Sequence, residues 1–189
     1  MWFFPDEQLP CISFYRYLKG DGNRAQCRST RCTYAHCESL INSNGEINYN
    51  PPSHETTSLM KIVLELMQAK RTIDICVYSL TYKELVEVLL FLKNRRAIKL
   101  RVITDSSSDN PNDQINNLRE SGVHVREKAM DLKKMHHKCV LIDNKVLLIG
   151  SFNWTHSAIC RNDESVLKTK QHKIVKQRAD HFNKLWREL

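Results

Sequence analysis

The sequence predicts an α/β domain over residues 58–189, preceded by a small cysteine-rich segment. Three observations support this prediction. The 189-residue chain is 41% hydrophobic and 26% charged, a composition that can bury an ordinary core. Helix-like and strand-like apolar patterns alternate from Ser58 onward, which favours βαβ units and a largely parallel sheet. Four of the seven cysteines lie before residue 38, so that segment has a different character.

The first half of the domain alternates helices with strands. Ser58 is a good N-cap for an apolar pattern of helical spacing, and each following run of β-branched and aliphatic residues indicates a strand. A polar loop, Asp105 to Pro111, interrupts the series. The predicted elements are a helix over 58–67, a strand over 72–78, a helix over 82–94, a strand over 98–104, a helix over 113–120 and a strand over 123–126.

The second half begins with a hairpin signal. Two apolar runs, 138–142 and 146–149, are joined by Asp143-Asn144-Lys145. A strand over 164–167 and a long helix over about 171–187 follow. Upstream, residues 42–57 contain Asn44-Gly45 and Pro51-Pro52 and indicate an irregular connection. The sequence therefore divides into a cysteine-rich segment (1–41), a connecting loop (42–57) and a main domain (58–189).

The positive charge lies entirely in the main part of the chain. Residues 1–50 hold five basic and five acidic side chains, whereas residues 51–189 hold 24 basic and 16 acidic ones, which accounts for the net charge of +8. This surplus favours a polyanionic partner, either nucleic acid or an acidic lipid surface. Charge alone does not choose between the two, and a merely solvated basic face is the third alternative.

The chain as written is expected to be soluble. Its longest strongly apolar stretch, Leu85 to Leu92, is interrupted by Glu87 and is far shorter than the roughly 20 residues that cross a bilayer. The aromatic start, Met1 to Phe4, is neither a signal peptide nor a span. It is compatible with the remnant of an anchor from a longer protein.

Polar residues along the hairpin form one extended motif. His136, Lys138 and Asp143, followed by Gly150-Ser151-Phe152-Asn153, give the pattern H-x-K-x4-D-x6-G-S-x-N. This pattern resembles the motif of the phospholipase D superfamily, and the resemblance extends from about Ser58 to the C-terminus. It implies a phospholipase D-like α/β/α sandwich. Since members of the family need two facing motifs and this chain has one, the resemblance also implies a homodimer with its active site on the two-fold axis.

The chemistry of the motif assigns roles to its residues. Alternate side chains of a strand share a face, so His136 and Lys138 point together and His137 points away. A neutral His136 imidazole is a nucleophile for a phosphodiester, giving a phosphohistidine, while His136 of the partner subunit serves as general acid and base. Three donors, Lys138, Asn153 and the hydroxyl of Ser151, would neutralise the phosphate oxygens, so that no catalytic metal is required.

Two acidic positions complete the predicted site by resemblance. Glu164 lies where the bacterial nuclease branch has a glutamate, and would accept the second ring N–H of the catalytic imidazole; Asp163 is the alternative. Asp143, at the hairpin tip, is more architectural than chemical in the family and pairs there with basic groups. The isolated histidines outside these motifs are expected to be structural or solvated, namely His54, His124, His156, His172 and His181.

The cysteine-rich segment carries a candidate zinc site. Cys11, Cys27, Cys32 and His36 have the ligand types and shortening gaps of three-cysteine, one-histidine zinc fingers, and a closed set of four ligands indicates a structural metal. Cys37 could replace His36, and a cluster of ordinary reduced thiols is the alternative. The later cysteines, Cys76, Cys139 and Cys160, lie in apolar segments and are expected to be inert core thiols.

Arginines are interspersed with aromatic residues between Cys11 and His36, a pattern typical of single-stranded nucleic acid binding. The zinc segment and the single motif together resemble the Zucchini branch of the superfamily. That resemblance implies a single-strand-specific endoribonuclease of Piwi-interacting RNA production on the outer mitochondrial membrane, facing the cytosol through an N-terminal anchor absent from this chain. The alternatives are a phospholipase that hydrolyses cardiolipin to phosphatidic acid and a non-catalytic, zinc-dependent RNA-binding scaffold. The arginines and rings, and the absence of a long apolar loop for acyl chains, favour RNA.

Overall fold

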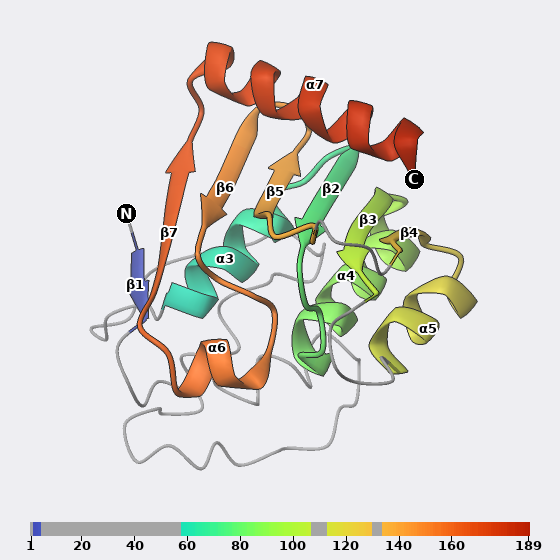
Figure 1. Ribbon diagram of the computed structural model, residues 1–189, viewed down its shortest axis with the longest axis horizontal. Coiled ribbons are helices and arrows are strands. Elements are labelled where there is room, and N and C mark those ends of the chain that lie inside the picture. Colours follow the sequence, from blue (N-terminus) through green and yellow to red (C-terminus); the bar gives the residue numbers. More distant parts are fainter. Residues whose placement is uncertain (1, 5–57, 107–112, 130–133) are drawn as a thin grey trace.

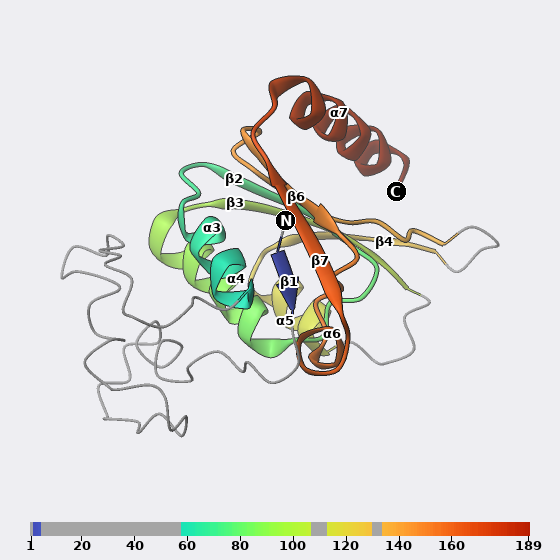
Figure 2. The ribbon, with the colours of Figure 1, turned by 90° about the vertical axis from the view of Figure 1, so that its left-hand side faces the viewer.

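A twisted sheet lies between two layers of helices (Figures 1 and 2). The computed structural model describes the backbone of residues 2–4 and residues 58–106, 113–129 and 134–189. Its elements are β1 (Trp2–Phe4), α3 (Ser58–Met67), β2 (Thr72–Val77), α4 (Lys83–Arg96), β3 (Lys99–Asp105), α5 (Asp113–Glu120), β4 (His124–Lys128), β5 (Lys138–Ile142), β6 (Val146–Gly150), α6 (His156–Cys160), β7 (Glu164–Thr169) and α7 (His172–Glu188). The layered arrangement confirms the predicted α/β/α sandwich.

The sheet is mixed, which corrects the expectation of a largely parallel one. Its strand order is β1-β7-β6-β5-β2-β3-β4. Strands β2, β3 and β4 are parallel, whereas β5, β6, β7 and β1 pair antiparallel. The difference follows from the connections, because helical crossovers join only the first three strands of the domain. A tight hairpin and a short connection through α6 return the chain antiparallel.

Two elements were not predicted from the sequence. Helix α6 has only five residues, and its N-cap Thr155 accepts a hydrogen bond from the backbone N–H of Ala158 (3.2 Å). Strand β1 pairs antiparallel with β7, from Trp2 opposite Val166 to Phe4 opposite Glu164. The backbone of the aromatic start therefore extends the sheet, beside β7 in Figure 1.

Each face of the sheet has its own hydrophobic core. The larger core lies between the sheet and helices α3, α4 and α5, and includes Leu66, Ile75 and Leu89. The smaller core lies under α7, where Val175 and Phe182 pack against residues such as Ile103. Burial on both faces explains why β2 is apolar almost throughout. No helix within the described ranges is both long enough and apolar enough to cross a membrane.

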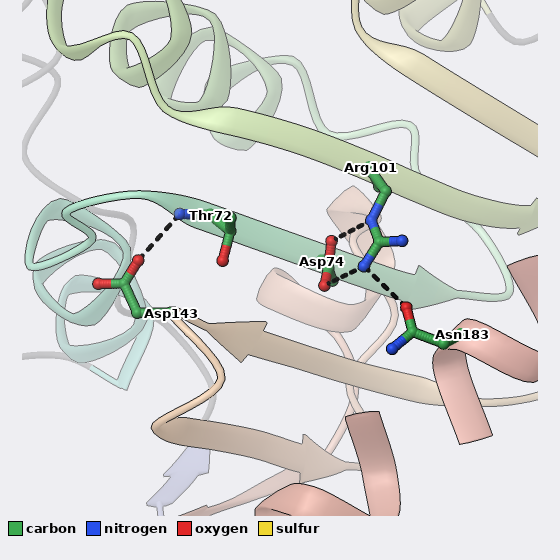
Figure 3. Close-up of polar contacts among 5 residues, drawn as sticks. All are labelled: Thr72, Asp74, Arg101, Asp143 and Asn183. Carbon is green, nitrogen blue, oxygen red and sulfur yellow. Dashed lines mark hydrogen bonds and ion pairs between the residues drawn. The ribbon is translucent and has the colours of Figure 1, made fainter. Parts of the chain in front are cut away.

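A polar cluster attaches α7 to the sheet (Figure 3). The guanidinium of Arg101 on β3 donates two hydrogen bonds of 2.7 Å to the carboxylate of Asp74 on β2, and a third of 3.1 Å to Asn183 of α7. The same guanidinium lies 4.9 Å from the ring centroid of Phe182 and 5.3 Å from that of Trp186. These contacts keep the buried carboxylate of Asp74 paired and set the position of the helix.

The zinc ligands predicted at Cys11, Cys27, Cys32 and His36 lie outside the described residues, as does the boundary between the first two segments. These assignments stay predictions. Among the later cysteines, Cys76 and Cys139 are buried opposite each other on β2 and β5, as expected of core thiols. The hydrogen bond with Cys139 raises the pKa of the Cys76 thiol, and burial raises it further, so that the thiol stays protonated. Cys160 is only half-buried, which departs from the expectation.

Candidate active site

Most of the predicted site residues gather at one end of the sheet. Lys138 opens β5 and pairs with Val77, the last residue of β2. Ser151 follows the end of β6, and Glu164 is the first residue of β7. Ligands of open α/β sheets bind at the carboxyl ends of the parallel strands. The ends of β2 and β3 meet the motif at this edge.

The predicted alternation of side chains along the motif is confirmed. The exposed ring of His136 lies against the ring of Tyr78, with 5.0 Å between centroids and 55° between planes. The ammonium of Lys138 lies 5.4 Å from the same centroid and donates to the carbonyl oxygen of His136 (3.1 Å). His137 turns to the other face of the sheet, toward α7.

The ring of His137 contacts the ring of His181, a residue expected from the sequence to be isolated. Their Nε2 atoms are 3.2 Å apart, and the two rings stand edge to face at 86°. Burial lowers the pKa of both imidazoles, and the nearby charge of Arg178 lowers it further. Neutral rings suit one N–H···N hydrogen bond between them. The pair links the start of β5 to α7 but faces away from His136.

Glu164 is buried, and its carboxylate is already engaged within the chain. It accepts hydrogen bonds from the hydroxyl of Ser151 and from the side-chain amide of Asn162 (3.0 Å for the latter). The Ser151 oxygen in turn accepts the backbone N–H of Ser165 (3.1 Å). The hydroxyl donor of Ser151 is therefore directed at Glu164 and not, as the motif predicts, toward a phosphate.

Glu164 makes no hydrogen bond to the imidazole of His136 among the described residues of one chain. The orienting role expected from the resemblance is thus not seen within one chain. The carboxylate nevertheless influences the site. Burial lowers the pKa of Lys138, and the negative charge of Glu164 offsets part of that decrease. The alternative, Asp163, is exposed at the surface.

Asn153 is held at the same edge by its neighbours. The loop after β6 is tied to the loop after β2, because Trp154 N–H donates to Ser79 (3.0 Å) and the Trp154 carbonyl accepts from Thr81 (2.8 Å). Phe152 and Trp154 are buried on either side. The Oδ1 atom of Asn153 is buried without a hydrogen-bond partner in the described part of the chain. The contacts between the two loops therefore hold Asn153 close to the loop after β2.

Asp143 lies at the other end of β5, about 17 Å of strand away from Lys138. Its carboxylate accepts the backbone N–H groups of Lys70, Arg71 and Thr72 at 2.8, 2.8 and 2.9 Å, and Figure 3 shows the contact with Thr72. Burial would raise its pKa, but these three donors hold the pKa below its ordinary value. The residue is thus architectural, with main-chain donors in place of the expected basic side chains.

Two residues at this edge were not identified from the sequence. Tyr78 follows β2 and touches both His136 and Lys138. Asp105 ends β3, is buried, and accepts the backbone N–H of Met135 (2.6 Å), immediately before His136. The available signal was positional, because both residues stand where a predicted parallel strand ends.

Comparisons with known proteins agree with this arrangement. The family profile described as "Cardiolipin synthase, PLD-like domain" matches residues 62–186. The mitochondrial cardiolipin hydrolase of Chlamydomonas reinhardtii is 34% identical over 185 residues, covering 97% of this chain and 71% of that protein. That of Xenopus laevis is 37% identical over 139 residues, covering 73% of this chain and 65% of that protein. That of Homo sapiens is 32% identical over 136 residues, covering 71% of this chain and 53% of that protein. The chain thus spans less than two thirds of the two vertebrate relatives.

Solved structures show the same fold. A phospholipase D family member, Nuc from Salmonella typhimurium, superposes with a TM-score of 0.63 at 23% identity, covering 71% of this chain and 90% of that one. NucT from Helicobacter pylori gives a TM-score of 0.60 at 23% identity, covering 68% and 87%. At this identity the likeness concerns the fold alone.

Proposed function

The chain belongs to the mitochondrial cardiolipin hydrolase family of the phospholipase D superfamily, and from that membership we propose that it hydrolyses phosphodiesters through a phosphohistidine on His136. One observation carries the proposal. The exposed imidazole of His136 and the ammonium of Lys138 share the ring of Tyr78 at the carboxyl end of β2. A nucleophile and a positive charge thus lie where an anionic diester can enter.

The reaction takes two displacements. A ring nitrogen of His136 bonds to phosphorus as the bond to the leaving oxygen breaks, and a second imidazole protonates that oxygen. The second imidazole then removes a proton from water, which attacks phosphorus and breaks the P–N bond. Lys138 and the amide of Asn153 stabilise the non-bridging oxygens, so the transition state needs no catalytic metal.

The second imidazole is His136 of the partner subunit in a two-fold homodimer. This chain carries one H-x-K motif, and the mechanism needs two histidines. Sedimentation of the active protein at twice the monomer mass would support the dimer. A fully active monomer would contradict it.

The substrate we favour is single-stranded RNA, cleaved in the production of Piwi-interacting RNAs at the outer mitochondrial membrane. The basic surplus of residues 51–189 and the arginines and rings of the cysteine-rich segment support it. Because the 2′-hydroxyl takes no part, the products carry 5′-phosphate and 3′-hydroxyl ends. Products ending in 2′,3′-cyclic phosphate would contradict this mechanism.

The second candidate substrate is cardiolipin, hydrolysed to phosphatidic acid. The names of the algal and vertebrate relatives favour it, because each is a mitochondrial cardiolipin hydrolase. The same two displacements would act on either diester. The chemistry therefore does not distinguish the two substrates, and the choice depends on which diester can reach His136.

One experiment tests both candidates. The protein is incubated with end-labelled single-stranded RNA and, separately, with vesicles containing cardiolipin, and His136→Asn is the inactive variant. We expect cleavage of RNA, a fall of at least about 10³-fold in His136→Asn, and nearly unchanged RNA binding. His137→Ala, on the opposite face, is the control and should retain turnover. Turnover of cardiolipin alone would select the second candidate, and undiminished cleavage by His136→Asn would refute the mechanism.

We further propose that Cys11, Cys27, Cys32 and His36 hold a structural Zn²⁺, with Cys37 as the alternative to His36. Three thiolates and an imidazole are a suitable donor set for that ion. In a chelator, cleavage should continue until zinc leaves this segment. Immediate loss of activity with rapid rescue by Mg²⁺ would contradict the metal-free mechanism.

A further inference from the structure

We propose that Tyr78 is a positioning residue of the active site, whose ring orients the imidazole of His136 and holds the ammonium of Lys138 beside it. This inference rests on the proposed function. Tyr78 is itself firmly placed. Its backbone N–H donates to the carbonyl of His137 (3.1 Å), and its own carbonyl accepts the hydroxyl of Thr104 (3.1 Å). The ring therefore stands on the same framework as the motif.

The first argument concerns what holds the nucleophile. His136 is exposed, and within the described residues its ring makes no hydrogen bond and has Tyr78 as its one ring contact. The carboxylate of Glu164 is engaged by Ser151 and Asn162. An unsupported imidazole would sample several rotamers, whereas attack on phosphorus requires one of them. The ring at 5.0 Å restricts that choice.

The second argument concerns charge. The ammonium of Lys138 lies 5.4 Å from the ring centroid of Tyr78, and that of Lys134 lies 5.7 Å from it. Cations are attracted to the face of an aromatic ring at such distances. The ring thus gathers two positive charges around the nucleophile, although they repel each other. A phosphodiester that enters would meet them already assembled.

The ring and the hydroxyl of Tyr78 make different contacts. His136 and Lys138 contact the ring, whereas the hydroxyl oxygen reaches the ammonium of Lys134 at 3.5 Å. A positioning role of the ring therefore predicts that Tyr78→Phe keeps catalysis. Tyr78→Leu should lose it. A chemical role of the hydroxyl predicts that both substitutions lose it.

The test uses bis(p-nitrophenyl) phosphate, a small diester whose cleavage is independent of whether RNA or lipid is the natural substrate. We expect Tyr78→Phe to keep kcat within about threefold of the wild type, and Tyr78→Leu to lower kcat at least about tenfold with little change in KM, because orientation acts on the chemical step. Tyr78→Trp, which keeps an aromatic face, should retain most of the kcat that Tyr78→Leu loses. Thermal unfolding of each variant checks that it is folded.

A second readout does not depend on activity. In NMR spectra of protein with labelled histidines, the Hε1 proton of His136 should carry a ring-current shift, assigned by its loss in His136→Asn. The shift should persist in Tyr78→Phe and disappear in Tyr78→Leu. If Tyr78→Leu is too unstable to study, Tyr78→Met replaces it, because methionine also lacks an aromatic ring.

The outcomes separate the two proposals. Failure of the wild type to cleave the probe would refute the proposed function and leave the NMR result to judge the contact. Cleavage by the wild type with an undiminished kcat in Tyr78→Leu would overturn the positioning role. An equal loss in Tyr78→Phe and Tyr78→Leu would overturn it too, since it would assign the effect to the hydroxyl.

Discussion

The carbonyl oxygen of Ser165 occupies the space that a side chain at Gly150 would need. A β-carbon added to Gly150 would stand 1.8 Å from that oxygen, far inside van der Waals contact. The close approach joins the end of β6 to β7, where Gly150 pairs with Val166. It also brings Ser151 to Glu164, so the glycine of the motif has a steric explanation.

Replacement of Gly150 by alanine should therefore be severely destabilising. We expect Gly150→Ala to lower the free energy of unfolding by about 3 kcal/mol or more, because the strands must separate to admit the methyl group. Gly122→Ala is the matched control, since its β-carbon would lie 3.5 Å from the end of the Lys93 side chain and only its φ of +75° is unfavourable. That variant should lose about 1–2 kcal/mol. Urea unfolding measures both, and equal losses would contradict the steric explanation.

The ion pair of Arg101 and Asp74 should contribute strongly to stability. Arg101→Met would leave the buried carboxylate of Asp74 unpaired and free Asn183 of α7. We expect a loss of about 2–3 kcal/mol, below the range for fully buried pairs because the Arg101 side chain is 30% exposed. Lys176→Ala breaks an exposed pair with Asp180 and should change the free energy of unfolding by under about 0.5 kcal/mol. A similar loss of stability in both variants would refute the strong contribution of the Arg101–Asp74 pair.

Asp143 should stabilise the fold only while it is ionised. Asparagine tolerates the residue's φ of +53° but removes the charge, so Asp143→Asn should cost about 1–2 kcal/mol at pH 7. Because the folded-state pKa of Asp143 is lowered, its contribution is present above the unfolded value of about 4 and is lost as the pH falls through the folded value. The difference between wild type and variant should therefore vanish in strong acid. Unfolding curves at pH 7 and at a series of decreasing pH values below 4 measure this decrease, and a difference that is independent of pH would argue against the carboxylate.

Acid should loosen the contact between β5 and α7. The pKa of His137 and of His181 is lowered in the folded protein, so the unfolded chain takes up protons first as the pH falls below about 6.5. Stability should therefore decrease from there until the pH passes the lowered folded-state values. His181→Asn should flatten this dependence, whereas His172→Asn, at an exposed position, should leave it unchanged. Identical slopes for wild type and His181→Asn would disprove the effect.

Local patterns in the sequence predict most elements of the domain and identify its motif. Helical spacing and β-branched runs are local properties, so α3, α5 and both hairpin strands lie where their patterns predict. Strand alternation likewise predicted which of two adjacent histidines faces the site, because the period of two is intrinsic to an extended backbone. Short or paired elements were missed: α6 is too brief for a periodic signal, and β1 exists through its pairing with β7.

Contacts between residues far apart in the sequence depend on the folded arrangement of the whole domain. Tyr78 and Asp105 join the site because two parallel strands end beside the motif, 31 to 58 residues away along the chain. His181 reaches His137 because α7 crosses the sheet, and Asp143 is held away from the site because the far end of β5 is bound to the start of β2. Such contacts depend on strand order and helix placement, which arise from the packing of the whole chain, and no local pattern contains them.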